Sequence, residues 1–586
     1  MGADQDLEDL MSHIGDFGKY QLRQYLLLSL AAVCAGLHML TSVTVSAVPK
    51  HRCAIPEVEV NGTVLDWNST EVRSWMVPDK DGTGYSQCLL HDEYKNITFK
   101  CDAWIYDHTY YKSSRAIEWN MVCDRRWMGA ISQMLYMLGV FSGAVVLGSL
   151  ADTYGRKKIF YISAIGQLAA GVSVAFVKNY VTFVTLTYIY GIFGSAGAFI
   201  TGYVLAMEII GASKRTFYGI GMQIFFASGI CLVAFWGWLI KDRVWLQLVY
   251  GLHSVLLIGH WWLIDESPRW LWANGRREEA VEIVERAMRV NDPGASMDTG
   301  RFLKGLKGKE KNEKEREANG DHEDLHEPRP NLGILDLFKT PQLRMRSLIV
   351  CLNWFAASLG YYGLSLGASR MEGNPYATLF FMAFIEAPCY FIVMAYMDRT
   401  GRRSMNSTFL LVGAVSLLAA TLIPKSSPAM QHLVTYVIYI GKFCVSGSFA
   451  IIYNYSAELF PTVLRNTGIG VGSMCARFAA ATTPLISLLD SFDERIPMFL
   501  FSIIVLVSGV LSMLLPETVN QPMPNSVEDG ENFRVGDTCC TTGCFPIGPQ
   551  ARPRTRGLSR HRRGSNDSVS SIQLTETHSL QHKEKT

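Results

Sequence analysis

The chain has 586 residues, of which 49% are hydrophobic and only 18% are charged. Soluble domains usually carry about 25% charged residues. So apolar a composition excludes a disordered chain, a collagen-like chain and a small disulfide framework, and the net charge of +2 gives no general case for nucleic-acid binding. A very apolar multi-domain enzyme or a polytopic membrane protein remains, and the arrangement of the apolar residues decides between them.

Twelve apolar runs are each long enough to cross a bilayer as a helix, which takes roughly 20 residues. They form two groups of six: 25–47, 128–150, 159–177, 181–206, 216–240 and 244–264, then 345–369, 375–397, 405–423, 431–455, 466–489 and 496–516. Buried helices of soluble proteins are usually shorter and edged by periodic polar residues. The sequence therefore predicts an all-α polytopic membrane protein with twelve transmembrane helices in two six-helix halves.

Polar segments divide the chain around these runs. The predicted parts are an N-terminus 1–23, a first half 24–264, a central loop 265–344, a second half 345–516 and a disordered tail 517–586. The acidic N-terminus and the length of the first run argue against a signal peptide, so that run is kept as a span. Basic residues favour the short loops around Arg156 and Arg402. Both termini and the central loop are therefore predicted to be cytoplasmic.

The segment 48–127 is predicted to be a large extracellular loop. It holds four cysteines, an even number as a disulfide framework requires: Cys53, Cys88, Cys101 and Cys123. Four cysteines allow three pairings, and the sequence does not choose among them. The same segment carries three glycosylation sequons, at Asn61, Asn68 and Asn96. Disulfides and glycans both belong outside the cell, so these features agree with the predicted orientation.

Three local patterns recur in the two halves at nearly the same spacing. They pair Asp152-Thr-Tyr-Gly155-Arg156 with Asp398-Arg-Thr-Gly401-Arg402, Glu208 and Arg215 with Glu458 and Arg465, and Glu266 with Glu517. The agreement indicates a duplicated six-span unit. Repeats of this kind are typical of secondary transporters, whose site lies between the halves near the membrane midplane.

Each repeated pattern places acidic and basic residues together at the cytoplasmic end of a span. Such clusters can form and break as the two halves rock, and Gly155 allows a tight turn beside them. We therefore predict gating roles for Asp152, Gly155, Arg156, Glu208, Arg215, Asp398, Arg402, Glu458 and Arg465. The alternative is that these residues are static topology signals and helix caps.

Several motifs together resemble those of one transporter family. They are Gly148-Ser-Leu-Ala-Asp-Thr-Tyr-Gly-Arg-Lys157, His13-Ile-Gly-Asp-Phe-Gly-Lys-Tyr-Gln21, Glu118-Trp-Asn-Met-Val-Cys123, Glu266-Ser-Pro-Arg-Trp-Leu271, Tyr361-Tyr-Gly-Leu364 and Ala457-Glu-Leu-Phe-Pro-Thr462 followed by Arg465-Asn466. The first resembles the loop motif of the major facilitator superfamily, and the set resembles its organic cation, anion and zwitterion (carnitine-type) transporter family over residues 8–518. The resemblance implies the major facilitator fold and plasma-membrane transport of small organic ions by alternating access, without ATP.

Three ionisable residues lie near the middle of predicted spans, where a charge is costly and usually faces a cavity or a partner: Glu386, Lys442 and Arg477. The Arg477 guanidinium can hold a carboxylate by two parallel hydrogen bonds. Glu386 can hold an ammonium group or take up a proton. Side by side, the two suit a zwitterion that resembles an amino acid. The alternative is that Glu386 and Arg477 pair only with each other.

The family resemblance bears on the same positions. Counting on from Glu458, Arg477 occupies the place where cation transporters of the family have aspartate and where anion and carnitine-type members have arginine. Glu386 matches cation and carnitine-type members, and Trp354 and Tyr361 match substrate-contacting aromatic positions. Tyr362 lies beside them, and aromatic faces attract organic cations. Lipid-facing anchoring is the alternative for these aromatics. Lys442 does not discriminate between branches, and a packing or gating role is equally open for it.

The predicted function is therefore transport of small zwitterions such as β-alanine or carnitine-like compounds, which insect members of the family handle. An organic cation or organic anion transporter is the alternative within the class, and a sensor that no longer moves solute is a further one. The sequence has no phosphate-binding loop, no paired metal-ligand motif and no nucleophile elbow. We expect no enzyme activity, cofactor or metal, while a coupling ion, H⁺ or Na⁺, is left open.

Overall fold

The computed structural model describes residues 2–543 apart from 57–58, 60–64, 68, 79–84, 93–95, 212, 260, 295–298, 300–301, 303, 306–332, 369–370, 372 and 425–426. The chain divides into two compact units, and the first, Met1–Phe545, contains every element below. Two predicted glycosylation sites, Asn61 and Asn68, lie outside the described residues. So do most of the charged part of the central loop and the tail beyond residue 543.

The first half begins with α1 (Gly2–Ser12) and contains six spans. They are α2 (Lys19–Met39) with α3 (Thr41–Val45); α6 (Arg126–Tyr154); α7 (Arg156–Phe176); α8 (Tyr180–Gly191) with the π-helix η2 (Ile192–Ala198) and α9 (Phe199–Ile209); α10 (Arg215–Leu239); and α11 (Arg243–Leu252) with α12 (Val255–Ile258). Two helices, α13 (Pro268–Ala273) and α14 (Arg277–Asn291), follow the last span and share an apolar cluster with α1.

The second half follows the 3-10 helix η3 (Ile334–Phe338) and repeats the six-span pattern. Its spans are α16 (Pro341–Gly367); α17 (Pro375–Phe384) with α18 (Glu386–Thr400); α19 (Arg402–Leu422); α20 (Pro428–Leu459); α21 (Arg465–Ser487) with η5 (Leu488–Ser491); and α22 (Ile496–Ser512). Ten helices of the described residues are long and apolar enough to cross a membrane, and Arg243–Ile258 and Ile496–Ser512 are shorter apolar helices. These twelve correspond in order to the predicted runs.

Small residues let the helices of the first half approach closely. A Cβ atom on Gly36 of α2 would overlap the carbonyl oxygen of Phe226 on α10, and one on Gly229 would overlap that of Val33. Close backbone contact of this kind is how membrane helices associate where lipid offers no hydrophobic driving force. Between the halves, α6 packs against α21, and α10 packs against α17 and α18.

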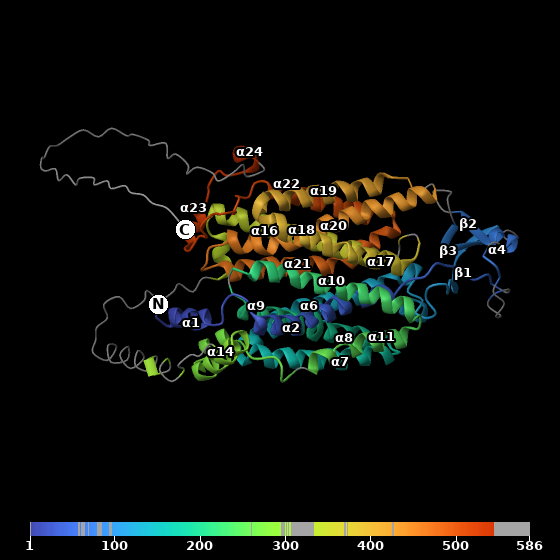
Figure 1. The fold of residues 1–586 in the computed structure, drawn as a ribbon. Coiled ribbons are helices and arrows are strands. Elements are labelled where there is room, and N and C mark those ends of the chain that lie inside the picture. Colours follow the sequence, from blue (N-terminus) through green and yellow to red (C-terminus); the bar gives the residue numbers. More distant parts are fainter. Residues whose placement is uncertain are drawn as a thin grey trace, which may run out of the picture. The chain divides into compact units, whose positions relative to one another are not determined.

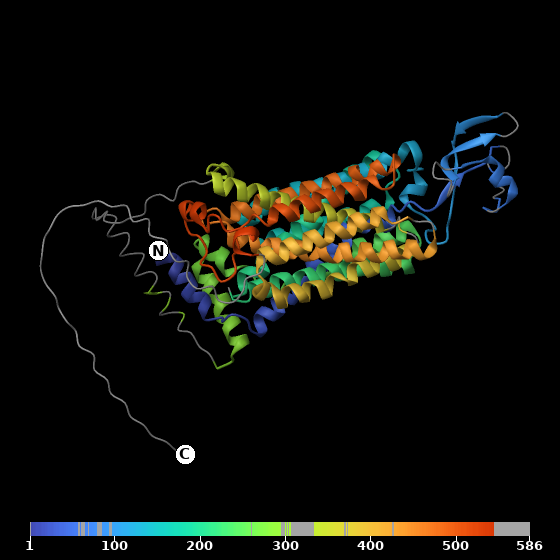
Figure 2. The same ribbon diagram turned by 90° about the horizontal axis from the view of Figure 1, so that it is seen from above.

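The two ends of the helix bundle carry different structures (Figure 1). One end, the loop face, carries the loop domain (residues 48–127). The other end, the motif face, carries α1, α14 and α23 (Val527–Asn532). Arg156 and Arg402, the first residues of α7 and α19, belong to this face because their backbone N–H groups bond to Glu266 and Glu517, which follow the last span of each half. Figure 2 shows the loop domain standing beyond the ends of the spans. The two faces are the ends that the sequence predicts to be extracellular and cytoplasmic.

The described residues of the loop domain form two small antiparallel sheets and short helices. One sheet pairs β1 (His51–Cys53) with β5 (Trp104–Tyr106), and the other has the order β2 (Met76–Pro78), β3 (Tyr85–Asp92), β4 (Ile97–Lys100). The short helices are α4 (Thr70–Trp75), α5 (Arg115–Glu118) and η1 (Cys123–Arg125).

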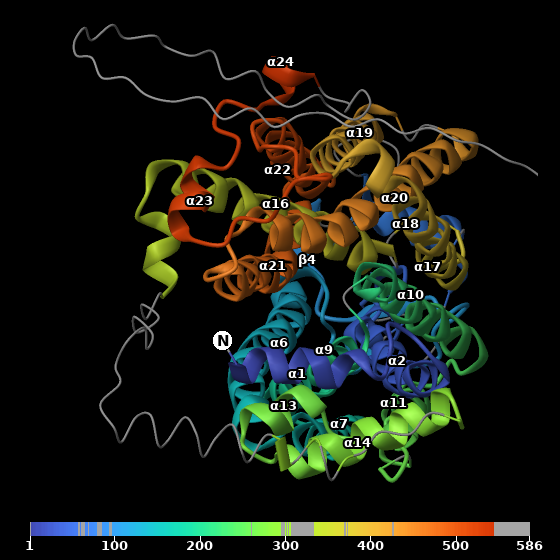
Figure 3. The same cartoon turned by 60° about the vertical axis from the view of Figure 1, so that its left-hand side comes forward.

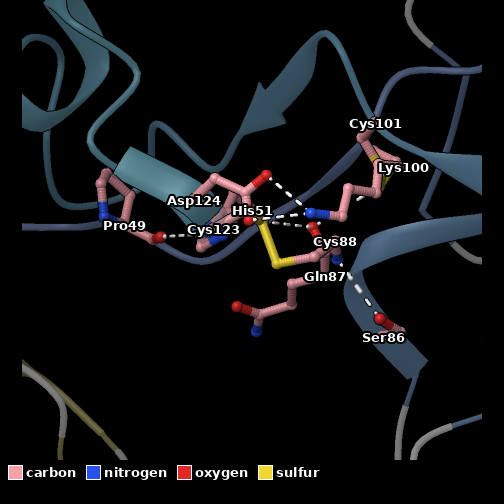
Figure 4. Close-up of a disulfide and its surroundings, with 10 residues drawn as sticks. Pro49, His51, Ser86, Gln87, Cys88, Lys100, Cys101, Cys123 and Asp124 are labelled. Atoms are coloured by element: carbon pink, nitrogen blue, oxygen red, sulfur yellow. Dashed lines mark hydrogen bonds and ion pairs between the residues drawn. A yellow bond between two sulfur atoms is a disulfide. The ribbon is translucent and has the colours of Figure 1, made fainter. Parts of the chain in front are cut away.

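Disulfides tie these elements together. Cys53 pairs with Cys101, and Cys88 pairs with Cys123, which is one of the three pairings that the sequence left open. Figure 4 shows the Cys88–Cys123 bond, beside which Lys100 lies 2.9 Å from the Asp124 carboxylate. The third sequon residue, Asn96, is exposed in the turn between β3 and β4.

The segment after the last span corrects one prediction. Residues 517–543, the C-terminal strap, fold into α23 and α24 (Cys539–Thr542) and pack on the motif face of the second half, with α23 beside α16 (Figure 3). The Glu531 carboxylate accepts the backbone N–H groups of Gln342 and Leu343, and Arg403 pairs with Asp537 at 3.0 Å with both side chains buried. The prediction of disorder from residue 517 is thus wrong for the strap, because its polar groups bond to the first turns of the neighbouring helices.

Candidate functional site

A cavity lies between the two halves and encloses about 80 Å³. By this measure a single water molecule needs about 10–15 Å³, so the cavity has room for several waters or a small organic solute. The first half contributes mostly apolar and weakly polar side chains, among them Met39, Ser195, Gln223 and Phe226. The second half contributes aromatic side chains from three helices and one arginine. The cavity therefore has the position and the lining of a solute site.

Aromatic side chains of α16 and α20 form one side of the cavity. This aromatic wall consists of Trp354, Tyr361, Tyr362, Phe449 and Tyr453. The rings of Trp354 and Tyr453 meet edge to face, with centroids 4.3 Å apart, and the Trp354 indole N–H donates to the Ser456 hydroxyl at 3.0 Å. The three aromatic residues that the sequence singled out, Trp354, Tyr361 and Tyr362, thus line the cavity together.

Arg477 of α21 is the charged residue among the side chains that line the cavity. It is half-buried, and its guanidinium donates to the backbone carbonyl oxygen and the hydroxyl of Ser473, one turn earlier on the same helix. Within the described part of the chain no carboxylate lies at ion-pair distance from it. A guanidinium keeps its charge and presents several donors in a fixed plane. Arg477 is therefore available to a carboxylate in the cavity.

Glu386 and Lys442 have a different environment, which corrects the expected arrangement. The Lys442 ammonium lies 3.0 Å from the Glu386 carboxylate, with both side chains buried. Among the described residues, Glu386 therefore pairs with Lys442 and not with Arg477. Neither Glu386 nor Lys442 lines the cavity. The sequence placed all three at one depth in the membrane, but it does not set the rotation of α18 about its axis. That rotation turns Glu386 toward α20, against which α18 packs.

The structure adds residues that the sequence did not single out. Tyr390 lines the cavity, and its hydroxyl donates a hydrogen bond of 3.0 Å to the Glu386 carboxylate. Tyr453 and Phe449 also line it. Tyr390 lies four residues after Glu386 and so shares its helix face, which is a signal that the sequence contained. Tyr453 and Phe449 carry no pattern that separates them from lipid-facing or packing residues.

The repeated motifs form two matching clusters at the motif face. Arg156 lies 2.8 Å from Glu208 and 3.3 Å from Asp152. In the second half, Arg402 lies 2.9 Å from Glu458 and 2.8 Å from Asp398. Each cluster joins helices of one half. A rocking motion of two rigid halves leaves such contacts unchanged.

Glutamates that follow the last span of each half complete these clusters. Glu266 accepts the backbone N–H groups of Arg156 and Lys157, and Glu517 accepts those of Arg402 and Arg403. A carboxylate at the N-terminus of a helix bonds to free N–H groups and meets the positive end of the helix dipole. The alternative that these motifs cap helices thus accounts for the contacts in the structure.

The remaining residues with predicted gating roles make local contacts. Gly155 has a φ of +108°, and a Cβ atom there would lie 2.6 Å from Glu266, so only glycine suits this turn. Arg215 donates to the Ile210 carbonyl oxygen at 3.0 Å, and Arg465 donates to the Thr462 hydroxyl at 3.2 Å. Both arginines therefore brace the turn before their own span.

Comparison with known proteins identifies relatives along most of the chain. A family model described as "Sugar (and other) transporter" matches residues 94–526. The chain is 35% identical to the "Organic cation transporter protein" of Drosophila melanogaster over 90% of this chain and 94% of that protein. It is 29% identical to the human "Organic cation/carnitine transporter 2" over 89% of this chain and 94% of that protein. These relatives are transporters and not enzymes, which confirms both the family resemblance and the prediction that the chain is not an enzyme.

Solved structures agree at the level of the fold. The inward-open xylose transporter XylE from E. coli matches with a TM-score of 0.55 and 15% identity over 87% of this chain and 98% of that chain. The proton:xylose symporter XylE bound to 6-bromo-6-deoxy-D-glucose matches with a TM-score of 0.53 and 15% identity over 88% and 98%. At this identity the likeness concerns the fold alone. It confirms the predicted twelve-helix major facilitator fold.

Proposed function

Because the chain belongs to the sugar (and other) transporter family of the major facilitator superfamily, we propose that it transports small organic ions that carry a carboxylate. One observation carries the proposal: Arg477 is the charged side chain that lines the cavity, and the described residues offer it no carboxylate partner. A guanidinium in such a setting favours a carboxylate from the solute. The aromatic wall of the same cavity suits an apolar or cationic group elsewhere on the solute.

Two solute classes fit this cavity. A zwitterion such as β-alanine or a carnitine-like compound would place its carboxylate on Arg477 and its cationic group against Trp354 and Tyr361. An organic anion would also place its carboxylate on Arg477. One observation favours the anion as a second candidate: Glu386, the expected partner of an ammonium group, does not line the cavity. The names of the relatives include organic cations, but a lone positive charge in the cavity opposes a purely cationic solute.

The transport mechanism that we propose is alternating access in the plasma membrane, with the loop face outside the cell and both termini in the cytoplasm. The two halves rock about the cavity, and contacts at the loop face close it on that side. Arg126 lies 2.7 Å from Asp490 across the halves, and the Tyr376 hydroxyl donates to the Tyr110 carbonyl oxygen at 2.8 Å. In this orientation Asn96 would carry a glycan on the exposed loop domain. A change in the gel mobility of the protein on substitution Asn96→Gln tests this.

The experiment is uptake into cells of labelled β-alanine, carnitine, an aromatic carboxylate and a quaternary cation, each divided by the amount of transporter at the surface. We expect uptake of one or more carboxylates and its loss in Arg477→Asp. Arg495→Asp is the control, because Arg495 is an exposed arginine of the same half. Repeating uptake with the proton or sodium gradient removed identifies any coupling ion. Uptake of the quaternary cation alone, unchanged in Arg477→Asp, contradicts the proposal, and solute binding without uptake identifies a sensor.

A further inference from the structure

A buried ion pair lies directly behind the aromatic wall of the cavity. The Lys442 ammonium and the Glu386 carboxylate are 3.0 Å apart, and the two side chains are 1% and 0% exposed. They come from α20 and α18. A charge at this depth in a membrane is expensive and persists where it has a partner or a function. Here each charge is the partner of the other, so the pair as a whole is neutral.

The pair also holds groups that face the cavity. One Glu386 oxygen accepts hydrogen bonds from the hydroxyls of Tyr361 at 3.1 Å and Tyr390 at 3.0 Å. The Lys442 ammonium donates to the Ser365 hydroxyl at 2.7 Å and lies 3.1 Å from the centre of the Tyr361 ring. Tyr361 and Tyr390 both line the cavity, whereas Glu386 and Lys442 do not. The pair thus ties tyrosines of α16 and α18 to a lysine of α20.

These contacts give the pair two consequences for the cavity. The tyrosine hydroxyls have their acceptor in Glu386, so their rings are held in one orientation toward the solute. The positive and negative charges of the pair cancel at close range, which leaves Arg477 as the uncompensated charge of the site. Removing one partner would leave an isolated charge in a low-dielectric environment, while replacing both by neutral groups would not.

We infer that Glu386 and Lys442 are positioning residues that orient Tyr361 and Tyr390 in the cavity. Arg477 alone then binds the charged group of the solute. The inference rests on the proposed function, because it assumes a transported carboxylate. It specifies that the cationic end of a zwitterion lies against aromatic faces and not on the Glu386 carboxylate. Zwitterions and anions of similar size then depend on the Glu386–Lys442 pair to the same extent.

The test compares single and double substitutions of the pair. Uptake of a labelled zwitterion and of an aromatic carboxylate is measured in wild type, Glu386→Gln, Lys442→Gln and the double variant, each per transporter at the cell surface. We expect uptake of both solutes to fall at least tenfold in each single variant. We expect the double variant to recover to within about threefold of wild type, with its zwitterion-to-anion ratio unchanged within twofold. A double variant that transports the anion but has lost the zwitterion overturns the inference, because Glu386 would then bind the ammonium group.

A second variant keeps the inference testable if the double variant does not reach the surface. Tyr390→Phe removes one hydroxyl that Glu386 holds and leaves the ion pair in place. We expect KM to rise severalfold for both solutes, with the maximal rate per transporter unchanged. Tyr455→Phe is the matched control, because Tyr455 of α20 does not line the cavity and its hydroxyl donates to the Pro516 carbonyl oxygen after the last span. An unchanged KM in Tyr390→Phe, or a rise for the zwitterion alone, contradicts the positioning role.

Failure of the inference and failure of the proposed function give different results. Wild type and Arg477→Asp are measured in the same assay. A wild type that takes up only the quaternary cation contradicts the proposed function itself. Loss of carboxylate uptake in Arg477→Asp, combined with a changed zwitterion-to-anion ratio in the double variant, leaves the proposed function standing and overturns the role of the Glu386–Lys442 pair.

Discussion

Arg126, the first residue of α6, forms an ion pair of 2.7 Å with Asp490 in η5 and so joins the two halves at the loop face. The Tyr376 hydroxyl makes a second connection there, to the carbonyl oxygen of Tyr110 in the loop domain. The arginine clusters of the motif face differ from this pair, because each lies within one half. A contact that must break when the halves separate at the loop face is therefore found at Arg126 and Asp490.

We expect Asp490→Asn to favour opening of the loop face. The Arg126 and Asp490 side chains are 36% and 13% exposed, and a partly exposed pair contributes up to about 1 kcal/mol, or roughly a fivefold change in an equilibrium. Ser358 lines the cavity, so the measurement is the rate at which an impermeant thiol reagent outside the cell labels a Ser358→Cys protein with and without Asp490→Asn. Asp124→Asn is the control, since its partner Lys100 lies in the loop domain. Exchanging the two charges between positions 126 and 490 should restore the original rate, and unchanged labelling in Asp490→Asn contradicts the assignment.

In the motif-face cluster of each half, we expect loss of the glutamate to destabilise the protein more than loss of the aspartate. Glu208 is 19% exposed beside Arg156, whereas Asp152 is 75% exposed. Glu458 and Asp398 differ in the same way, at 22% and 73%. Exposed pairs contribute little and less exposed pairs more. We therefore expect Glu208→Gln and Glu458→Gln to lower the melting temperature by several degrees in detergent, and both aspartate-to-asparagine variants by about one degree. An aspartate variant that destabilises as much as its glutamate counterpart contradicts this reading.

The C-terminal strap is expected to depend on the buried pair of Arg403 and Asp537. Their side chains are 3% and 6% exposed, and removing one partner of a buried ion pair costs about 3–5 kcal/mol. We expect Asp537→Asn to release the strap, so that limited proteolysis in detergent cleaves within residues 517–543 at least tenfold faster. Glu528→Gln, an exposed change on α23, serves as the control. Equal cleavage of both variants would show that the strap is held by its other contacts.

The loop domain is expected to lose stability in acid through Glu59. Burial acts to raise the pKa of Glu59, but hydrogen bonds from Arg52 and from the backbone N–H groups of Ile55 and Leu65 outweigh it, and the pKa is lowered. A carboxyl group with a lowered pKa in the folded state contributes stability that is present above its unfolded pKa of about 4.3. This contribution is lost as the pH falls through the folded pKa.

The measurement for this prediction is hydrogen exchange of residues 48–127 between pH 6 and pH 3. Wild type should lose protection below about pH 4.3, and Glu59→Gln should show weaker protection at pH 6 and a smaller change with pH. Glu71→Gln, at an exposed position on α4, should behave as wild type. A Glu59→Gln profile that falls as steeply as that of wild type assigns the acid sensitivity to other groups.

The number and order of the spans were predictable from the sequence alone. Span length is set by the thickness of the bilayer, and the duplication appears as repeated residues at nearly one spacing, so both are one-dimensional properties. The pairing of Arg156 with Glu208 and of Arg402 with Glu458 repeats in the structure as the motifs repeat in the sequence. Trp354, Tyr361, Tyr362 and Arg477 line one cavity, and for all but Tyr362 the family resemblance had already indicated the position.

Only the tertiary structure decided which charges meet. Glu386, Lys442 and Arg477 lie at one depth in their spans, and hydropathy gives depth but not the rotation of each helix about its axis. Packing of α18 against α20 sets that rotation, turns Glu386 to Lys442 and leaves Arg477 to the cavity. The sequence likewise did not determine the pairing of the four cysteines, because pairing depends on which residues meet in space. The C-terminal strap is polar and so resembles a solvated tail in the sequence, and only the structure shows the helix ends to which its side chains bond.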